Sequence, residues 1–335
     1  MGRARLVFAA IAIVFAGGMS VFSSLMSRRA QEIQSQVAAG TWVPQAASAD
    51  DPEGQERQRA QKLGRYAVCV DYIRVARVRD AYFAWADPAA GIPADARPRH
   101  LPALGGNVAQ CVSTVQEAAR LPPAIPELEA AGIALGAALG VLEPQLEEAR
   151  RYYEREDWRT DGFAHGLEIH PALSLALARA AEAQRTLSDV LEREQHALSL
   201  ARIARLEARP DRGVELRVER LMVSADDFLA ALRDPVVADP EAVDPAAAAR
   251  LSALADRVRT AADDLTAYAA AHRAEADAMW ASQLLGECDD FVRNTRIRAL
   301  QLAGDPAARH DRGLGNEQVI SAYNDLVSGY NALRR

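Results

Sequence analysis

Apolar residues recur at alternating steps of three and four along most of this chain, and that spacing constrains the fold more than any other feature. The longest run lies in residues 251–279, and similar runs occupy residues 135–153, 173–198 and 214–232. An average step of 3.5 residues keeps one apolar stripe on the face of a helix that packs at a shallow angle against a neighbour. The spacing therefore predicts an all-α fold, an elongated antiparallel helical bundle with long, coiled-coil-like helices. The stripe of the longest run consists of Leu251, Leu254, Val258, Ala261, Leu265, Tyr268, His272, Glu275 and Met279.

Prolines and turn residues set the expected ends of the helices. We expect one continuous helix over residues 55–86 and a helix that opens at Pro171. A further helix is expected to start at Asp244 and to run on, with a bend at Gly286, to about Leu302. Pro144 predicts a kink or a break inside its own helix, because it lacks the backbone N–H that the helix needs. His272 lies on the apolar stripe, so we expect it to be buried. Surface loops are expected at residues 87–102, 234–244 and 304–315.

The first 29 residues have the pattern of a membrane-directed segment. Residues 6–26 carry no charge, and Arg28 and Arg29 follow directly. This length reaches the roughly 20 residues that a membrane-spanning helix needs, so we predict a signal-anchor, with a cleaved signal peptide as the alternative. Residues 30–54 are expected to form a linker. Residues 55–335 are expected to form a single helical domain outside the cytoplasm, because the loops between helices are too short to hold a second core.

The charge balance argues against a general nucleic-acid-binding protein. The net charge is −7, whereas such proteins present a basic face to phosphates. Lys62 is the single lysine among 39 basic residues, which we interpret as a compositional bias toward arginine.

The three cysteines do not have the spacing of a metal site. Cys69, Cys111 and Cys288 are far apart in sequence, and no pair is two to four residues apart. Two interpretations stay open. Cys69 and Cys111 could join two helices by a disulfide in an oxidising compartment, or all three could be small buried side chains.

A second group of residues offers candidate metal ligands, all within 14 residues in the middle of the chain. A helical metal site needs ligands three or four residues apart on one face. Asp161 and His165 meet this spacing, whereas His165 and His170 do not, and Gly162 makes a regular helix doubtful. The alternative is a structural connection in which Asp161 caps a helical turn and aromatic residues close the end of the bundle. The candidate ligands are Asp157, Asp161, His165, Glu168 and His170.

Motifs for nucleophilic or cofactor chemistry are absent from the sequence. There is no Gly-x-Ser-x-Gly turn, no glycine-rich phosphate loop before a lysine, and no cysteine close to a histidine. We therefore predict no cofactor and favour a protein without catalytic activity.

Two motifs and, less specifically, the segment from Leu63 to Ile73 resemble a known family. The central motif lies in residues 152–170, and a closing motif repeats Tyr-Asn with a seven-residue spacing. Together they resemble the YiiG-like family of bacterial envelope proteins, a domain of unknown function. The resemblance implies an all-helical envelope protein with no assigned catalytic residues, although this chain lacks the lipid-modified cysteine that usually precedes the domain. The motif residues are Tyr152, Tyr153, Asp157, Trp158, Asp161, Phe163, Gly166, His170, Tyr323, Asn324, Tyr330 and Asn331.

The closing motif allows two interpretations. Tyr323 and Tyr330 lie on one face of a helix, because seven residues make about two turns. They could form a strip that contacts a partner or a glycan, or they could be core tyrosines whose hydroxyl groups bond to a neighbouring helix.

These features predict an uncharacterised, non-enzymatic binding or scaffold protein on the periplasmic side of the bacterial inner membrane. It would be tethered to the membrane by its N-terminal helix and would contact an envelope protein partner. The alternatives are a ligand-sensing ectodomain that acts through a partner, and a metal-dependent hydrolase that uses the central Asp and His residues.

Overall fold

The computed structural model describes residues 51–209, 212–233, 244–278, 281–305, 308 and 315–333. Regular secondary structure in these residues is entirely helical, with one isolated β-bridge between Asp87 and Gly91. The all-α prediction is therefore confirmed. The predicted signal-anchor, nearly all of the linker and most of the 234–244 and 304–315 loops lie outside the described residues. In the described part of the chain, no helix has both the length and the apolar character needed to span a bilayer.

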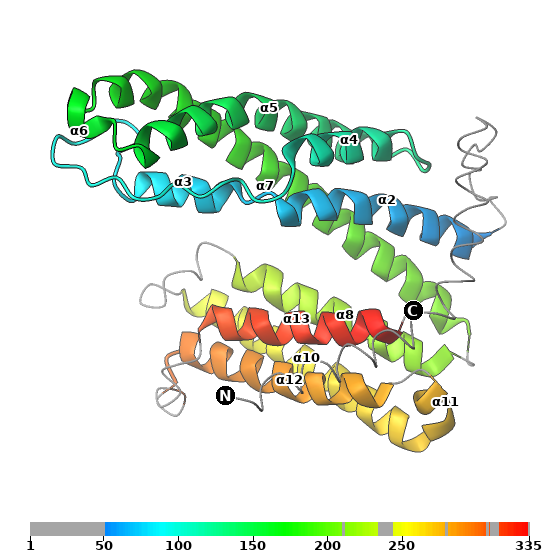
Figure 1. Ribbon diagram of the computed structural model, residues 1–335. Coiled ribbons are helices and arrows are strands. Elements are labelled where there is room, and N and C mark those ends of the chain that lie inside the picture. Colours follow the sequence, from blue (N-terminus) through cyan, green and yellow to red (C-terminus); the bar gives the residue numbers. More distant parts are fainter. Residues whose placement is uncertain are drawn as a thin grey trace, which may run out of the picture.

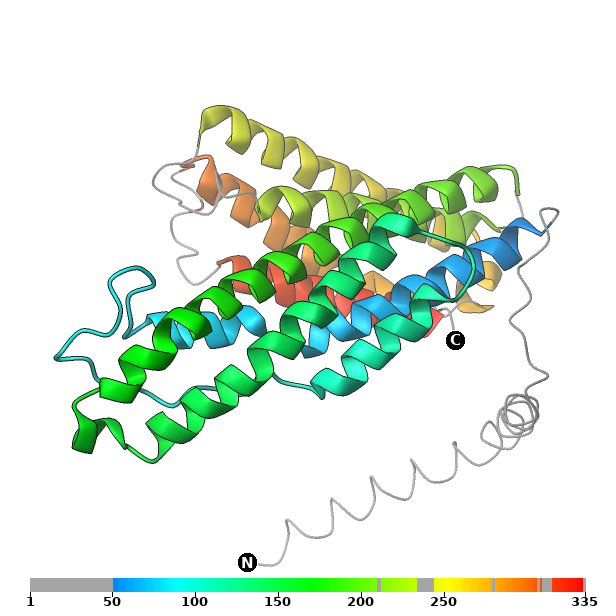
Figure 2. The same ribbon diagram turned by 90° about the horizontal axis from the view of Figure 1, so that it is seen from above.

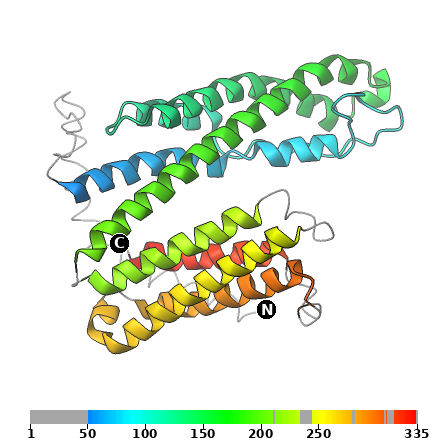
Figure 3. The same cartoon turned by 180° about the vertical axis from the view of Figure 1, so that it is seen from behind.

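The helices form two groups that lie one above the other (Figure 1). Figure 2 shows the same groups from above, and Figure 3 shows from behind how α7 runs from the first group toward α8. The first group contains α2 (Pro52–Tyr72), α3 (Val75–Phe83), α4 (Val108–Ala119), α5 (Pro126–Glu154), α6 (Trp158–Asp161) and α7 (Ala164–Glu207). The second contains α8 (Gly213–Leu232), α10 (Pro245–Ala271), α11 (Arg273–Ala278), α12 (Ala281–Leu302) and α13 (Asn316–Leu333).

Buried apolar side chains gather in two clusters. The first core takes residues between Leu63 and Leu191, and the second core takes residues between Val214 and Leu326. The helix α7 is 44 residues long and connects the two, because its first half belongs to the first core and its C-terminal part packs beside α8. That residues 55–335 form a single domain therefore remains a prediction. The coiled-coil character of the helices also remains a prediction.

The predicted apolar stripes are buried where the helices are longest. Leu135, Leu139 and Leu142 have no exposed surface, and they lie on α5, which packs against α7 and α4. The predicted stripe of α8 is likewise buried, and it consists of Val214, Val218, Leu221, Ala225, Phe228 and Leu232. The helical period of the apolar residues was enough to identify the buried faces of α5 and α8, because each of these helices packs against a neighbouring helix.

The predicted helix over residues 55–86 is wrong, because the chain breaks at Ile73 into α2 and α3. Ile73 has an extended backbone, and the Arg74 N–H donates to the carbonyl of Leu104. A distant side chain stabilises this break: the Gln184 amide on α7 donates to the carbonyl oxygens of Val70 and Ile73. These bonds replace the helical partners that the carbonyls lose.

The predicted helix start at Pro171 is also wrong, because α7 begins seven residues earlier. Gly162 and Phe163 have left-handed backbones with φ of 61° and 69°, which separates α6 from α7. Pro171 and Pro144 both lie inside continuous helices, so Pro144 does not break α5.

His272 was expected to be buried on a continuous helix, but it is exposed and ends α10. Its backbone leaves the helical region, and its ring stacks on Tyr268 with a centroid distance of 3.9 Å. The guanidinium of Arg217 lies 3.8 Å from the centroid of the same Tyr268 ring. The tyrosine therefore contacts two cationic or ionisable groups near the start of α8.

Gly132 and Gly140 on α5 provide a matched test of this packing. A Cβ at Gly132 would lie 2.5 Å from the Tyr66 ring and 2.6 Å from a methyl of Val115, whereas no atom lies within 4 Å of a Cβ at Gly140. We expect Gly132→Ala to lower the free energy of unfolding by about 1 to 3 kcal/mol. Gly140→Ala should raise it by about 0.5 to 1 kcal/mol, because alanine favours the helix. Urea denaturation followed by circular dichroism measures both, and equal effects would contradict the close contact of α5 with α2 and α4.

Candidate functional site

The central motif lies at one end of the first group, where α3, α5 and α7 meet. Its tyrosines join an aromatic cluster, which we define as Tyr82, Trp85, Tyr152, Tyr153 and His170. The Trp85 ring meets the rings of Tyr82 and Tyr153 edge to face, at centroid distances of 4.9 and 4.7 Å. Such edge contacts are favourable because the positive ring edge meets the negative ring face. The motif residues therefore pack with one another and with α3.

Within the aromatic cluster, His170 is buried and bonded on both sides. Its Nδ1 lies 2.8 Å from the Tyr82 hydroxyl, and its Nε2 lies 3.3 Å from the Ser174 hydroxyl. A neutral ring with its proton on Nε2 satisfies both contacts, because Tyr82 then donates to Nδ1. Burial lowers the pKa of His170, and the backbone of Pro88 and Asp87 offsets this only in part. Burial also raises the pKa of Tyr82 to about 12.

Asp161 caps the start of α7. Its Oδ1 accepts hydrogen bonds from the Tyr152 hydroxyl (2.8 Å) and the Phe163 N–H (2.9 Å), and its Oδ2 accepts from the His165 N–H (3.2 Å). Burial raises the pKa of Asp161, but these donors outweigh it and the net pKa is lowered. Trp158 stacks on Phe163 beside this cap. The carboxylate therefore holds the first turn of a helix whose N-terminal N–H groups need acceptors.

Gly166 lets α7 approach the tyrosines closely. A Cβ at this position would lie 3.1 Å from the Tyr153 hydroxyl, from a Tyr152 ring carbon and from an Ile92 methyl group. The glycine of the central motif thus has a packing role.

The five candidate metal ligands do not come together. His170 faces Tyr82 inside the cluster, whereas His165 is half-exposed between Glu148 and Glu168. Asp161 caps α7, and the Asp157 backbone carbonyl accepts from Thr160. Across the described residues, no group of three or more His, Cys, Asp or Glu side chains is arranged to hold a metal ion.

The two tyrosines of the closing motif bond to acidic residues of α8. Tyr323 donates to Asp226, and Tyr330 donates to Glu219 at 2.7 Å. Both pairs are seven residues apart, so α13 and α8 run antiparallel in one register. Burial raises the pKa of Asp226, and Glu219 has 2% of its surface exposed. Asn324 is exposed, and the side chain of Asn331 lies outside the described residues. These hydroxyl groups thus join two helices of the second core.

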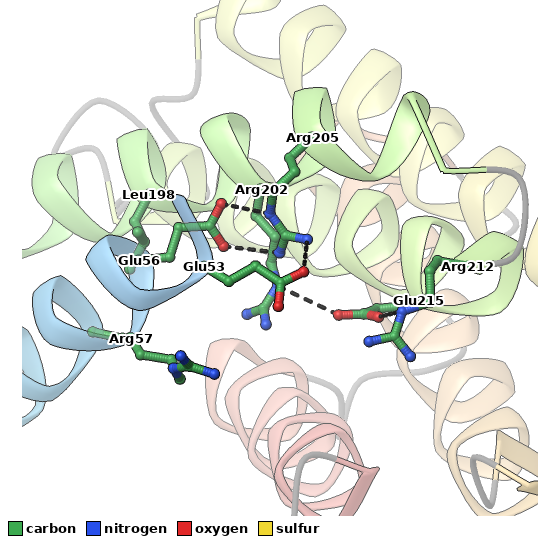
Figure 4. A pocket seen from close by; sticks show the side chains of 9 residues that line it. Glu53, Glu56, Arg57, Leu198, Arg202, Arg205, Arg212 and Glu215 are labelled. Carbon is green, nitrogen blue, oxygen red and sulfur yellow. Dashed lines mark hydrogen bonds and ion pairs between the residues drawn. The ribbon is translucent and has the colours of Figure 1, made fainter. Parts of the chain in front are cut away.

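A polar cavity that the sequence did not point to lies where α2, α7 and α8 meet (Figure 4). Its volume is about 200 Å³, and its walls carry four arginines and three glutamates. Arg205 binds both oxygens of Glu56 at 2.9 Å and also contacts Glu53 at 3.0 Å. Charged residues at these positions look like an ordinary solvated helix surface in the sequence, so no signal distinguished them. The lining residues are Glu53, Glu56, Arg57, Ala60, Leu198, Arg202, Arg205, Arg212 and Glu215.

The fold and these sites define an all-helical protein whose prominent polar residues bond mainly to one another. The chain belongs to a protein family of unknown function, DUF3829, whose model matches residues 57–332. This confirms the expected membership of an uncharacterised domain family. No curated protein and no solved structure matched the chain.

The opposite environments of His170 and His165 predict opposite pH effects on stability. In the unfolded chain the His170 side chain takes up a proton near pH 6.5, whereas in the folded protein it does so only at lower pH. The contribution of His170 to the free energy of unfolding therefore falls as the pH decreases below about 6.5, by at most about 1.4 kcal/mol per pH unit. The pKa of His165 is raised by the hydrogen bond with Glu168 and by nearby carboxylates. Its stabilising effect is therefore complete below about pH 6.5 and is lost as pH rises through the folded pKa.

Urea denaturation between about pH 5 and pH 8 tests these opposite pH effects on stability, because histidine titrates in that range. His170→Gln should remove part of the destabilisation at low pH, whereas His165→Gln should remove stabilisation at low pH. An unchanged pH slope in His170→Gln would contradict the burial of a neutral ring.

Proposed function

We propose that the protein is a non-enzymatic helical binding or scaffold module of the bacterial cell envelope, tethered to the inner membrane by its N-terminal segment. The observation that carries this proposal is the engagement of the motif side chains inside the helix packing. Tyr152 donates to Asp161, and His170 is hydrogen-bonded to Tyr82. Tyr323 and Tyr330 donate to carboxylates of α8. Groups used in this way hold helices together and are not presented to a substrate. The YiiG-like resemblance of both motifs agrees with an envelope location.

The cysteines give independent support for a compartment outside the cytoplasm. Cys69 of α2 and Cys111 of α4 form a disulfide, with Cα atoms 5.0 Å apart. Structural disulfides persist in oxidising compartments such as the periplasm and are rare in the cytosol. The bond therefore favours the proposed location over a cytoplasmic one.

Cell fractionation with thiol labelling tests the location. Cells are quenched with acid, and free thiols are tagged with a maleimide reagent before and after reduction. We expect the chain in the membrane fraction, with Cys69 and Cys111 labelled only after reduction. N-terminal sequencing of the same material distinguishes an anchor from a cleaved signal peptide. Reduced cysteines in a cytoplasmic fraction would overturn the envelope proposal.

In-cell photo-crosslinking tests the binding role. Ile133 and Val141 of α5 are large apolar side chains that are more than half exposed, and such side chains are favoured at protein contacts. A photoreactive residue at either position should trap an envelope protein, whereas one at Glu182, an exposed charged position of α7, should trap little. Equal trapping at all three positions would contradict a specific partner.

A ligand-sensing ectodomain is the second candidate, and the cavity between α2, α7 and α8 favours it. Residues from both helical groups line this cavity. A ligand bound there would contact both groups at once, and signalling would then pass through a partner protein.

A further inference from the structure

The cavity at the junction of the two groups is lined by four arginines and three glutamates. Glu56 is bound by Arg205, and Glu53 is bound by Arg205 and by Arg209 at 2.8 Å. Glu215 lies 3.2 Å from Arg212 and 3.6 Å from Arg202. Each carboxylate on the cavity wall therefore already has an arginine partner.

The other three lining arginines form ion pairs without aligned hydrogen bonds, and Arg202 and Arg212 share the carboxylate of Glu215. Arg57, Arg202 and Arg212 donate none of the side-chain hydrogen bonds found within the described residues, in contrast to Arg205. Arg57 is 3.9 Å from Asp51, and both side chains are largely exposed, so this contact contributes little. In Figure 4 no dashed line reaches Arg57 from the other residues drawn.

Arg202 has the most buried side chain of the three. Only 19% of its side chain is exposed, and its Nε is buried without a hydrogen-bond partner in the described part of the chain. Its nearest contact is an ion pair of 3.2 Å with Glu219, which Tyr330 also contacts. This contact joins Nε itself to the Glu219 carboxylate, but the two are not aligned for a hydrogen bond, so the buried donor still lacks an aligned acceptor.

We propose that this cavity binds a small oxyanion, a phosphate or carboxylate group, through Arg57, Arg202 and Arg212. Guanidinium groups form paired hydrogen bonds with the oxygens of such anions. A cavity of about 200 Å³ admits a small anion and is too small for a drug-sized molecule. Arg57 and Arg212 lie on opposite sides of the cavity, so one anion between them would connect α2 with the start of α8 (Figure 4).

The oxyanion therefore joins the two helical groups. Arg57 belongs to α2, Arg202 to α7, and Arg212 directly precedes α8. Binding should reduce hydrogen exchange at the N-terminal turns of α2 and α8, because both would be held by the same ligand. The proposal rests on the proposed binding role, but it concerns the purified chain and can fail while the envelope location holds.

Isothermal titration of the full-length chain with inorganic phosphate, and separately with malonate, tests the site. We expect saturable binding of one anion with a Kd of about 0.01 to 1 mM. The double variant Arg57→Gln/Arg212→Gln should weaken it by at least about tenfold. Tighter binding of phosphate or of malonate tells which oxyanion the site prefers.

The matched control is Arg185→Gln/Arg259→Gln, which removes two exposed arginines paired only with local carboxylates. It deletes the same charge and should bind as the wild type does. Arg57 and Arg212 are exposed enough for substitution without loss of fold, which circular dichroism verifies. Absence of saturable binding to both anions would overturn the proposal, and so would equal weakening in the two double variants.

Discussion

Replacing Lys62 with methionine is expected to lower the free energy of unfolding by about 3 to 5 kcal/mol. The ammonium group of Lys62 has no exposed surface and donates to the carbonyl oxygens of Leu121 and Pro123, each at 2.8 Å. It also donates to Glu129, which accepts a further bond from the N–H of Ile125. One side chain thus satisfies two carbonyl oxygens of the turn between α4 and α5 and a carboxylate near the start of α5.

The cost arises because methionine keeps the volume and removes the donors. Burial raises the pKa of Glu129, but the hydrogen bond and the charge of Lys62 keep the net pKa lowered, which shows how closely the pair is coupled. Without Lys62, the partly buried carboxylate of Glu129 and two carbonyl oxygens lose their partner. The double variant Lys62→Met/Glu129→Gln should recover part of the loss, because it removes the unpaired charge.

Arg65→Met is the matched control. Arg65 lies one turn further along α2 and forms an exposed ion pair of 3.6 Å with Glu117, which is expected to contribute less than about 1 kcal/mol. Urea denaturation of the three variants measures the difference. Equal losses in Lys62→Met and Arg65→Met would show that the buried lysine is not the central contact of this turn.

The sequence interpretation of Lys62 illustrates what local patterns omit. A single lysine was attributed to compositional bias, yet it is the most buried cation of the first core. Its acceptors are 59 to 67 residues away, so no spacing rule connects them. The stripes of α5 and α8 were predictable because burial there follows the helical period, and each helix has its neighbour along its full length.

The prediction of one continuous helix over residues 55–86 was wrong for a related reason. Nothing near Ile73 in the sequence ends a helix, and the carbonyls freed there are satisfied by Gln184, which is 111 residues away from Ile73. For the candidate site, the central motif did indicate which side chains gather. It could not indicate Tyr82 as the partner of His170, since these two are 88 residues apart. The polar cavity between α2, α7 and α8 is harder to predict from the sequence than the central motif, because its residues come from three helices.

Removing the disulfide is expected to lower the free energy of unfolding by about 4 kcal/mol. Cys69 and Cys111 are separated by 42 residues, and the bond ties α2 to α4 around α3 and the 87–102 loop. Much of the effect comes from the unfolded chain, which gains conformational freedom when the loop opens. Alanine is the appropriate replacement, because both positions are buried and serine would place hydroxyl groups there.

The comparison is between the wild type and Cys69→Ala/Cys111→Ala, each denatured with and without dithiothreitol. Reductant should destabilise the wild type to nearly the level of the variant, and it should leave the variant unchanged. Cys288→Ala is the control for loss of a buried thiol, since Cys288 is free and burial raises its pKa to about 12. Its cost should come from lost packing alone, and it should keep the response to reductant. A wild type insensitive to dithiothreitol while unfolded would mean that Cys69 and Cys111 are not joined, and the strongest physical support for an oxidising compartment would be lost with them.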